Sequence, residues 1–261
     1  MLHTDNQKWD WLSDMAKTNR TLYWWVFAAL TFVFFVFLQV PAAWLIAKFY
    51  NNNHLLHNVS GNIWQGQADW KHGQLRGTLT WSSRPLDLIL LRLAAQVQIK
   101  SGQTELNTKL AYGLGKTLYI QELNGDIAPD TLKLFAAWQW PNQALHLDNI
   151  NVHYKKDAGF SVVEGQMHWQ GGLLIYPFSD RQERIDIPAL SAQLKQEKKQ
   201  MIVDVRDQRE QKMLNVTLDP QLMLDVQLTQ RLLLNNSNYQ GQASLESYVF
   251  STRQPLIQGG V

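Results

Sequence analysis

The sequence contains no cysteine, and this absence excludes several kinds of chemistry at once. A chain without cysteine has no disulfide framework, no thiolate metal site and no cysteine nucleophile. The absence assigns no compartment, because cysteine-free chains are tolerated in both the cytoplasm and the periplasm. Neither sign of charge is in excess, since 24 Lys and Arg balance 22 Asp and Glu. The composition therefore indicates neither a nucleic-acid partner nor a polybasic membrane patch.

Sequence patterns that carry catalysis are also missing. The chain has no G-x-S-x-G nucleophile elbow, no glycine-rich phosphate loop and no dinucleotide fingerprint. Among its seven histidines, His54 and His57 lie three residues apart without the glutamate of a zinc-protease helix. The other candidates, His146, His153 and His168, are scattered over predicted strands. We therefore expect no enzyme activity, no cofactor and no metal site.

Charge is absent from one long stretch near the N-terminus, residues 21–47. Its most apolar part begins at Leu22 and ends at Leu38. About 20 helical residues cross a hydrocarbon core of roughly 30 Å. A single segment in lipid must be helical, because its backbone has to satisfy its own hydrogen bonds. The sequence predicts one transmembrane helix over residues 21–47, which contacts the lipid bilayer through the run from Leu22 to Leu38.

Basic residues set the predicted orientation of this helix. Lys17 and Arg20 precede the uncharged run, whereas Lys48 alone follows it before Lys71. Because basic residues favour the cytoplasmic side, we expect residues 1–20 to be cytoplasmic and residues 48–261 to form an exported domain. The alternative is a signal peptide cleaved after residue 42. That alternative is disfavoured, since the apolar run exceeds the roughly 7 to 15 residues of a signal peptide.

Residues after position 50 alternate between apolar and polar side chains, which is the pattern of strands with one buried face. The clearest alternations lie at residues 75–81, 93–99 and 222–228. Further predicted strands cover residues 145–147, 150–154, 161–169, 185–194, 201–205 and 214–218. Turn signals lie at residues 100–103, 124–126, 156–159 and 235–238. Short helices are predicted at residues 85–93 and 129–138.

Two short patterns occur twice along the predicted domain. Residues 64–68 recur as residues 239–243, and residues 77–81 recur as residues 165–169. We interpret the copies as similar hairpin units along one sheet, since a solenoid requires a regular period and at least three copies. The charged run at residues 195–200 is interpreted as a solvated hairpin tip rather than a binding patch.

A motif after the predicted membrane helix resembles that of a known family. A G-x-x-W-x-G pattern is followed by L-x-W and then by proline; its residues are Gly61, Trp64, Gly66, Trp81 and Pro85. Placed after a single N-terminal anchor, this arrangement resembles the opening signature of the type II secretion system protein N family. The resemblance covers the anchor and residues 59–102, and it continues more loosely at residues 165–171.

The resemblance implies an accessory component of the inner-membrane platform that exports folded proteins through the outer membrane of Gram-negative bacteria. It implies no catalysis, and it implies other type II secretion subunits as partners. Together with the strand pattern, it predicts a mainly β fold in which a transmembrane helix precedes an elongated, curved antiparallel sheet in the periplasm. The motif residues are interpreted either as turns and core anchors of that sheet or as contacts with a partner.

Two other functions remain open from the sequence. A curved sheet with an open apolar groove can cradle acyl chains, as in a periplasmic lipid-handling or envelope-biogenesis protein, and a filled core opposes this function. An envelope glycosidase requires two carboxylates about 5 to 10 Å apart in a cleft. The sequence leaves the oligomeric state open.

Overall fold

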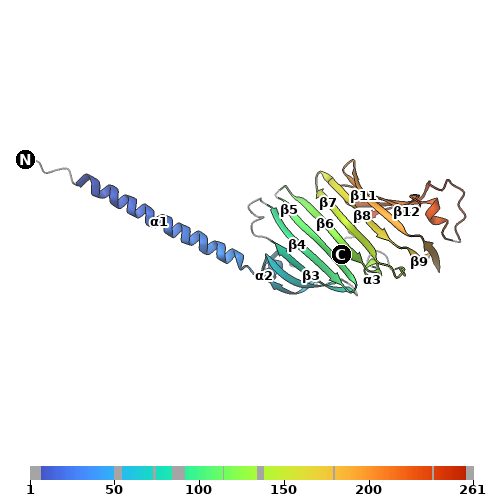
Figure 1. Ribbon diagram of the computed structural model, residues 1–261, viewed down its shortest axis with the longest axis horizontal. Helices are drawn as coiled ribbons and strands as arrows, with labels where there is room; N and C mark the ends of the chain where they lie inside the picture. Colours follow the sequence, from blue (N-terminus) through green and yellow to red (C-terminus); the bar gives the residue numbers. More distant parts are fainter. Residues whose placement is uncertain are drawn as a thin grey trace, which may run out of the picture.

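The computed structural model describes residues 7–49, 55–72, 75–83, 92–113, 115–133, 138–178, 180–236 and 238–256. A long helix leads into a broad sheet of strands (Figure 1). The helices are α1 (Gln7–Leu38), α2 (Ala42–Phe49), α3 (Pro129–Leu132) and α4 (Gln230–Leu233). The strands are β1 (Leu56–Gly61), β2 (Gln65–His72), β3 (Leu75–Ser83), β4 (Arg92–Ser101), β5 (Thr104–Gly113), β6 (Thr117–Ile127), β7 (Leu145–Lys155), β8 (Gly159–Trp169), β9 (Gly172–Phe178), β10 (Arg181–Ile187), β11 (Leu190–Glu197), β12 (Gln200–Asp207), β13 (Lys212–Leu218), β14 (Met223–Thr229) and β15 (Tyr248–Pro255).

Thirteen of these strands form one antiparallel sheet whose spatial order follows the sequence. The order runs from β1 to β8 and then from β11 to β15. The β9–β10 hairpin leaves the sheet after β8, and β11 returns to pair with β8, placing Leu190 opposite Trp169. The prediction of a mainly β chain with a long antiparallel sheet is confirmed.

The period-two pattern located many of the strands. The alternations at residues 75–81 and 93–99 lie in β3 and β4. The alternation at residues 222–228 lies in β14 except for its first residue, Leu222. The charged run at residues 195–200 forms the exposed tip of the β11–β12 hairpin, as predicted. Strands β1, β2, β5, β6, β9 and β15 were missed. In β2 and β5, glycine, alanine and threonine occupy many of the positions where a strong pattern needs large apolar side chains.

Several local predictions are wrong. Residues 185–194 do not form one strand: β10 ends at Ile187 and β11 begins at Leu190, and the two belong to different sheets. Pro188 between them has no N–H to continue a strand ladder. Residues 124–126 form no turn but lie inside β6, and residues 145–147 and 150–154 are parts of the one strand β7.

The predicted repeats and short helices are correct only in part. Residues 77–81 and 165–169 both lie on strands, but residues 239–243 lie in a loop, so they do not repeat the β2 segment at residues 64–68. The predicted helix at residues 129–138 begins as α3, and its residues 134–137 lie outside the described residues. The one predicted at residues 85–93 lies outside the described residues, except for its last two positions in β4.

The large sheet has one apolar face and one polar face. The apolar face carries a single buried cluster of Leu147, Ile150, Phe160, Val163, Ala192, Leu194, Val203, Val205 and Leu218. The polar face carries a row of successive cross-strand partners, namely Ser60, Gln67, Thr80, Gln98, Asn107 and Asn124. The alternation between these faces is the origin of the period-two pattern in the sequence.

Curvature of the sheet helps to cover its apolar face. Helices α3 and α4 have four residues each, too few to form a covering layer. The Tyr154 hydroxyl on β7 donates a hydrogen bond to the carbonyl oxygen of Pro220, which follows β13, at 3.0 Å. These strands lie four strand spacings apart, roughly 19 Å in a flat sheet. The sheet must therefore curl for this contact to form.

Two bulges in neighbouring strands contribute to the bend. Glu122 in β6 and Asn149 in β7 have φ of +51° and +46°, and the strand register shifts at both positions. The Glu122 N–H donates to Asn151 Oδ1 at 2.9 Å, and the Asn149 N–H donates to Asn124 Oδ1 at 2.8 Å. A bulge bends its strand and increases its twist. The side chains of Asn151 and Asn124, which accept these two bonds, therefore hold the local curvature in place.

Helix α1 extends away from the sheet (Figure 1). Its side chains are described from Tyr23 onward, and the large apolar ones are exposed, from 44% at Phe37 to 73% at Trp25. Among the described residues, no helix is both long and apolar enough to cross a membrane. The predicted single helix over residues 21–47 is divided at residues 39–41, where Pro41 cannot supply an N–H for a continuous helix.

We expect Gly165→Ala to destabilise the sheet. Gly165 has φ +129°, and a Cβ there would lie 2.6 Å from Ile150 Cα beside the β7 bulge. The free energy of unfolding should fall by about 2 kcal/mol or more, as backbone strain and a steric clash combine. Urea unfolding of the full chain, followed by tryptophan fluorescence, measures the change. The control is Gly115→Ala, where the nearest atom lies at 3.8 Å and a change within about 0.5 kcal/mol is expected. Equal values for both variants would contradict the packing argument.

Candidate interaction site at the helix–sheet joint

Three predicted motif residues meet across the first three strands. Gly61 is the cross-strand partner of Gly66, and Gly66 is the partner of Trp81. Gly61 has φ +91°, and a Cβ on Gly66 would lie 2.9 Å from Trp81 Cε2. The next indole repeats the arrangement, since a Cβ on Gly77 would lie 2.6 Å from Nε1 of its partner Trp70. Each indole thus occupies the space that a glycine leaves, which pins the strand register.

Asn62 organises the turn between β1 and β2. Its Oδ1 accepts the N–H of Trp64 at 3.0 Å and of Gln65 at 2.8 Å, and its carbonyl oxygen accepts Trp81 Nε1–H at 3.2 Å. Asparagine favours such turns, because its side chain can bond the backbone two residues on. Sequence reasoning missed Asn62, although an asparagine directly after the motif's first glycine is a turn signal.

Trp64 joins the sheet to α1. Its carbonyl oxygen accepts the N–H of Ser83 at 2.6 Å and the Ser83 hydroxyl at 3.0 Å. Its ring packs edge-to-face on Phe37 at the end of α1, with centroids 5.4 Å apart. Beside it, the Ile63 N–H donates to the carbonyl oxygen of Val40 at 3.2 Å. Four residues of the turn and the helix end are thereby held together.

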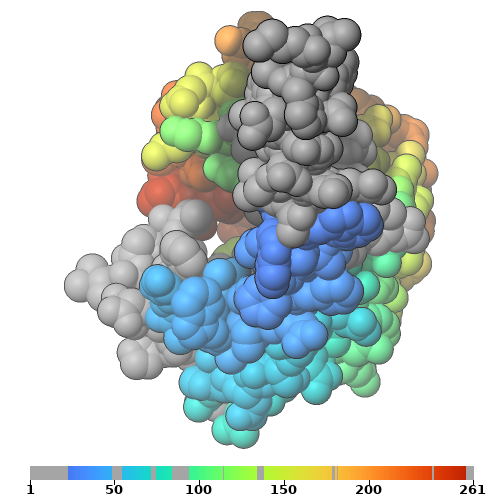
Figure 2. Space-filling view, turned by 90° about the vertical axis from the view of Figure 1, so that its left-hand side faces the viewer, coloured from blue at the N-terminus to red at the C-terminus, as the bar shows by residue number. Residues whose placement is uncertain are grey.

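Helix α2 and the two indoles of the motif lie around this joint. Helix α2 lies against β1, and Figure 2 shows α2 and the first strands together at the end of the molecule from which α1 extends. The indoles of Trp64 and Trp81 are partly buried. Trp64 Nε1 is buried and has no hydrogen-bond partner among the described residues. The fifth motif residue, Pro85, lies outside the described residues.

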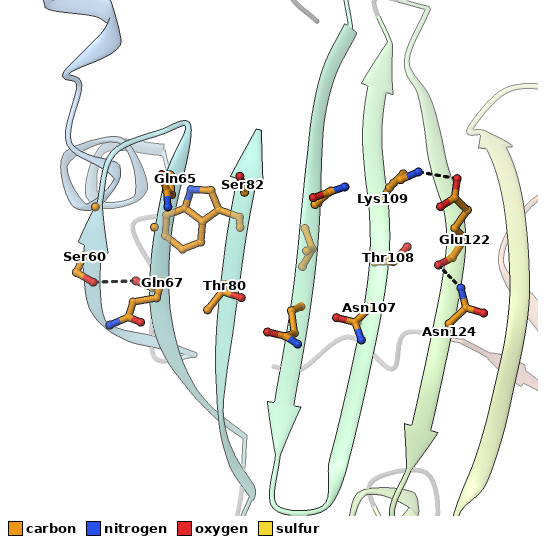
Figure 3. A pocket seen from close by; sticks show the side chains of 16 residues that line it. Ser60, Gln65, Gln67, Thr80, Ser82, Asn107, Thr108, Lys109, Glu122 and Asn124 are labelled. Atoms are coloured by element: carbon orange, nitrogen blue, oxygen red, sulfur yellow. Dashed lines mark hydrogen bonds and ion pairs between the residues drawn. The ribbon is translucent and has the colours of Figure 1, made fainter. Parts of the chain in front are cut away.

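A groove of about 900 Å³ opens on the polar face of β1 to β6, next to the joint (Figure 3). One wall is the row from Ser60 to Asn124 described above, and the adjacent row consists of Gln65, Ser82, Gln96 and Lys109. Lys109 Nζ lies 2.6 Å from Glu122 Oε1, so the charges that line the groove neutralise each other. The groove offers uncharged amides and hydroxyls, which donate and accept hydrogen bonds without acid–base chemistry.

The groove carries neither of the two alternative chemistries. Glu122 is the one acidic side chain among the described residues that line it, so a pair of catalytic carboxylates is not assembled there. Trp81 and Val97 also line the groove, but most of the lining side chains are amides and hydroxyls, whereas an acyl chain requires a mainly apolar lining.

The histidines are arranged more closely than the sequence suggested. His146 on β7 faces His168 on β8, and His146 Nδ1 lies 2.9 Å from Asp126 Oδ1. His153 packs instead against a tyrosine ring. In the part of the chain that the structure describes, no group of three His, Asp or Glu side chains is placed to hold a metal ion. His54 lies outside that part.

Comparison with known proteins agrees with the motif. Neither the curated proteins nor the solved structures produced a match to the chain. The chain does match the family described as "Type II secretion system (T2SS), protein N" over residues 52–247. The matched region contains the G-x-x-W-x-G motif and every strand from β1 to β14. Because this match covers most of the chain, the protein belongs to the type II secretion system protein N family.

Proposed function

We propose that this protein is an accessory inner-membrane component of the type II secretion machinery that acts through protein–protein contacts in the periplasm. Membership of the family makes it a component of that system. One observation carries the rest of the proposal: an apolar helix whose described side chains are exposed to solvent is joined at one end to a large sheet. Such a helix needs a covering, and the part of the chain that the structure describes does not supply one.

Lipid is the covering that best fits α1. Leaving many large apolar side chains in water costs roughly 25 cal/mol for each Å² of exposed apolar surface. Between Tyr23 and Phe37 these side chains point in all directions around the helix, whereas a protein-binding helix has one apolar stripe. The uncharged run at residues 21–47, with Lys17 and Arg20 before it, supports an N-terminus in the cytoplasm.

The joint supports a sheet held close to the membrane surface. Pro41 ends the helical run just where Phe37 meets Trp64, so the sheet starts where the proposed span ends. In α2, Lys48 Nζ lies 5.0 Å from the centre of the Trp44 ring, and Trp44 is 55% exposed. A tryptophan beside a lysine suits the boundary between lipid and water.

The motif residues take two roles in this proposal. Gly61, Gly66 and Trp81 maintain the fold, since their close approach sets the register of the first strands. Trp64 positions the sheet relative to the anchor through Phe37. Partner contacts are then left to the exposed surfaces of the sheet rather than to the motif.

The alternative functions have less support. A lipid-handling protein needs an open apolar groove, but from β7 to β13 the apolar face buries Leu147, Phe160, Leu194 and their neighbours in a filled cluster. The large groove is instead on the polar face. Contact with other proteins is therefore the function that the geometry favours.

The first prediction concerns topology. A reporter that is active only in the periplasm, fused after Val261, should be active, because the basic residues precede the proposed span. The same reporter fused before Met1 is the matched control and should be inactive. An inactive C-terminal fusion at a normal protein level would contradict the orientation, and a mature chain starting near Ala43 would contradict the anchor.

The second prediction concerns the sheet. Deleting residues 51–261 while keeping the anchor should reduce export of a type II cargo, since the proposed contacts lie on the deleted part. The measurement is the fraction of cargo in the medium, with the full chain restored from a plasmid as control. Unchanged export in the deletion strain would overturn the proposed function.

The third prediction separates folding from partner contact at Trp81. Trp81→Ala should lower the free energy of unfolding by roughly 2 to 4 kcal/mol, because it empties the space over Gly66. Trp81→Phe keeps an aromatic ring but loses the bond to the Asn62 carbonyl, so a loss of about 1 kcal/mol is expected. Thermal unfolding measures both. A Trp81→Ala protein with an unchanged melting temperature and defective export would make Trp81 a contact residue.

A further inference from the structure

The two edge strands of the large sheet, β1 and β15, differ in how well they are protected from pairing with another strand. At one end, β1 has six residues, a register shift and a residue with positive φ, Asn58, and α2 lies against it. At the other end, β15 has eight residues, and every one of them is exposed. Among the described residues no strand pairs with the outer edge of β15. One end of the sheet is therefore protected and the other is open.

The hydrogen-bonding groups on the open edge follow from the strand register. The Leu256 N–H donates to the carbonyl oxygen of Leu222 at 2.9 Å, so residue 256 points toward β14. Because main-chain groups alternate in direction along an antiparallel strand, the N–H and C=O groups of Ser251 and Arg253 point outward. The main chain of Pro255 also faces outward. Proline is tolerated at such a position because the N–H that it lacks would make no hydrogen bond within the sheet.

The usual protections of an edge strand are weak here. Natural edges are blunted by lysines, inward charges, bulges or a covering element. The one charged side chain of β15, that of Arg253, is held by Asp219 at 2.6 Å rather than standing free at the edge. Phe250 is 50% exposed. From Phe250 to Pro255 the pairing with β14 is regular. The outer edge of this part of β15 can therefore pair with a further strand along its main chain.

We propose that the free edge of β15 binds an extended strand of another secretion-machinery protein by β-strand addition; this inference rests on the proposed function. The partner segment supplies main-chain acceptors for the Ser251 and Arg253 N–H groups and main-chain donors for the outward carbonyls. It carries an apolar side chain on the face of Phe250. Main-chain bonds of this kind supply affinity, and the alternating side chains supply specificity.

Membership of the type II secretion family favours a different protein over a second copy. The family implies other secretion subunits as partners, and an extended segment of one of them can pair with the open edge of β15. Pairing of two copies through their β15 edges is the competing outcome, and the crosslinking test distinguishes it.

The test uses the absence of cysteine. Thr252→Cys gives the full-length chain a single thiol on β15, which is labelled with a photo-crosslinker in cells that assemble the machinery. Thr217→Cys is the matched control, because Thr217 lies on the interior strand β13. We expect a crosslinked product with another secretion subunit from position 252 and none from position 217. A product of two copies of this chain, or no product from position 252, would overturn the proposal.

A second pair of variants tests the main chain. In the Thr252→Cys background, Ser251→Pro removes an outward N–H, whereas Ser251→Ala keeps it; both lose the bond from Ser251 Oγ to Asp225 Oδ1. The yield of crosslinked product should be at least about fivefold lower with proline, because the partner's carbonyl is left unbonded. Equal yields would overturn the proposal. If Ser251→Pro unfolds, as judged by its melting temperature, Arg253→Pro against Arg253→Ala repeats the comparison.

The two proposals fail in different ways. If deletion of the sheet impairs export but the proline and alanine variants give equal crosslinking, the edge proposal is wrong and the proposed function stands. If deletion of the sheet leaves export unchanged, the proposed function is wrong, and the edge proposal, which rests on it, falls with it.

Discussion

One constraint governs this protein: a single sheet with one apolar face has to cover most of that face by itself. No layer of long helices lies over the strands in the described part of the chain. The sheet curls until Tyr154 on β7 bonds the chain beyond β13, and a cluster from Leu147 to Leu218 fills the inside. The bulges at Glu122 and Asn149 supply part of the bend, and glycine is needed where the backbone approaches closely.

The same constraint explains why the first strands carry the family motif. The β1 end of the sheet is where the chain arrives from α1, and its first strands are short of large apolar side chains. Glycine–indole pairs and the Asn62 turn give this region a fixed register that burial alone does not impose. A fixed register at this point makes the contact between Phe37 and Trp64 a defined joint.

The proposed function depends on the surfaces that stay exposed after the sheet curls. Because the core buries the apolar face from β7 to β13, the surfaces proposed for partners are the polar face, with its rows of amides, and the open edge of β15. In the described part of the chain, neither surface brings together three His, Asp or Glu side chains that could hold a metal ion. On the polar face of β12, Arg206 donates hydrogen bonds to Asp204 Oδ2, and this pairing raises the pKa of the guanidinium. Such surfaces agree with the proposed role in contacts between secretion proteins.

The sequence by itself determined the class of fold, the strands with strong alternation, the family motif and the uncharged N-terminal run, because each depends on neighbours along the chain. It did not determine β1, β2, β5, β6, β9 or β15; in β2 and β15, small or polar residues follow no clear period. Nor did it give the break at Pro188, the bulges in β6 and β7, or Asn62 as the centre of the joint. Those features depend on which strand lies beside which, and on how a sheet bends to bury its apolar face. That pairing and curvature are tertiary properties, and they decided which edge of the sheet stays open.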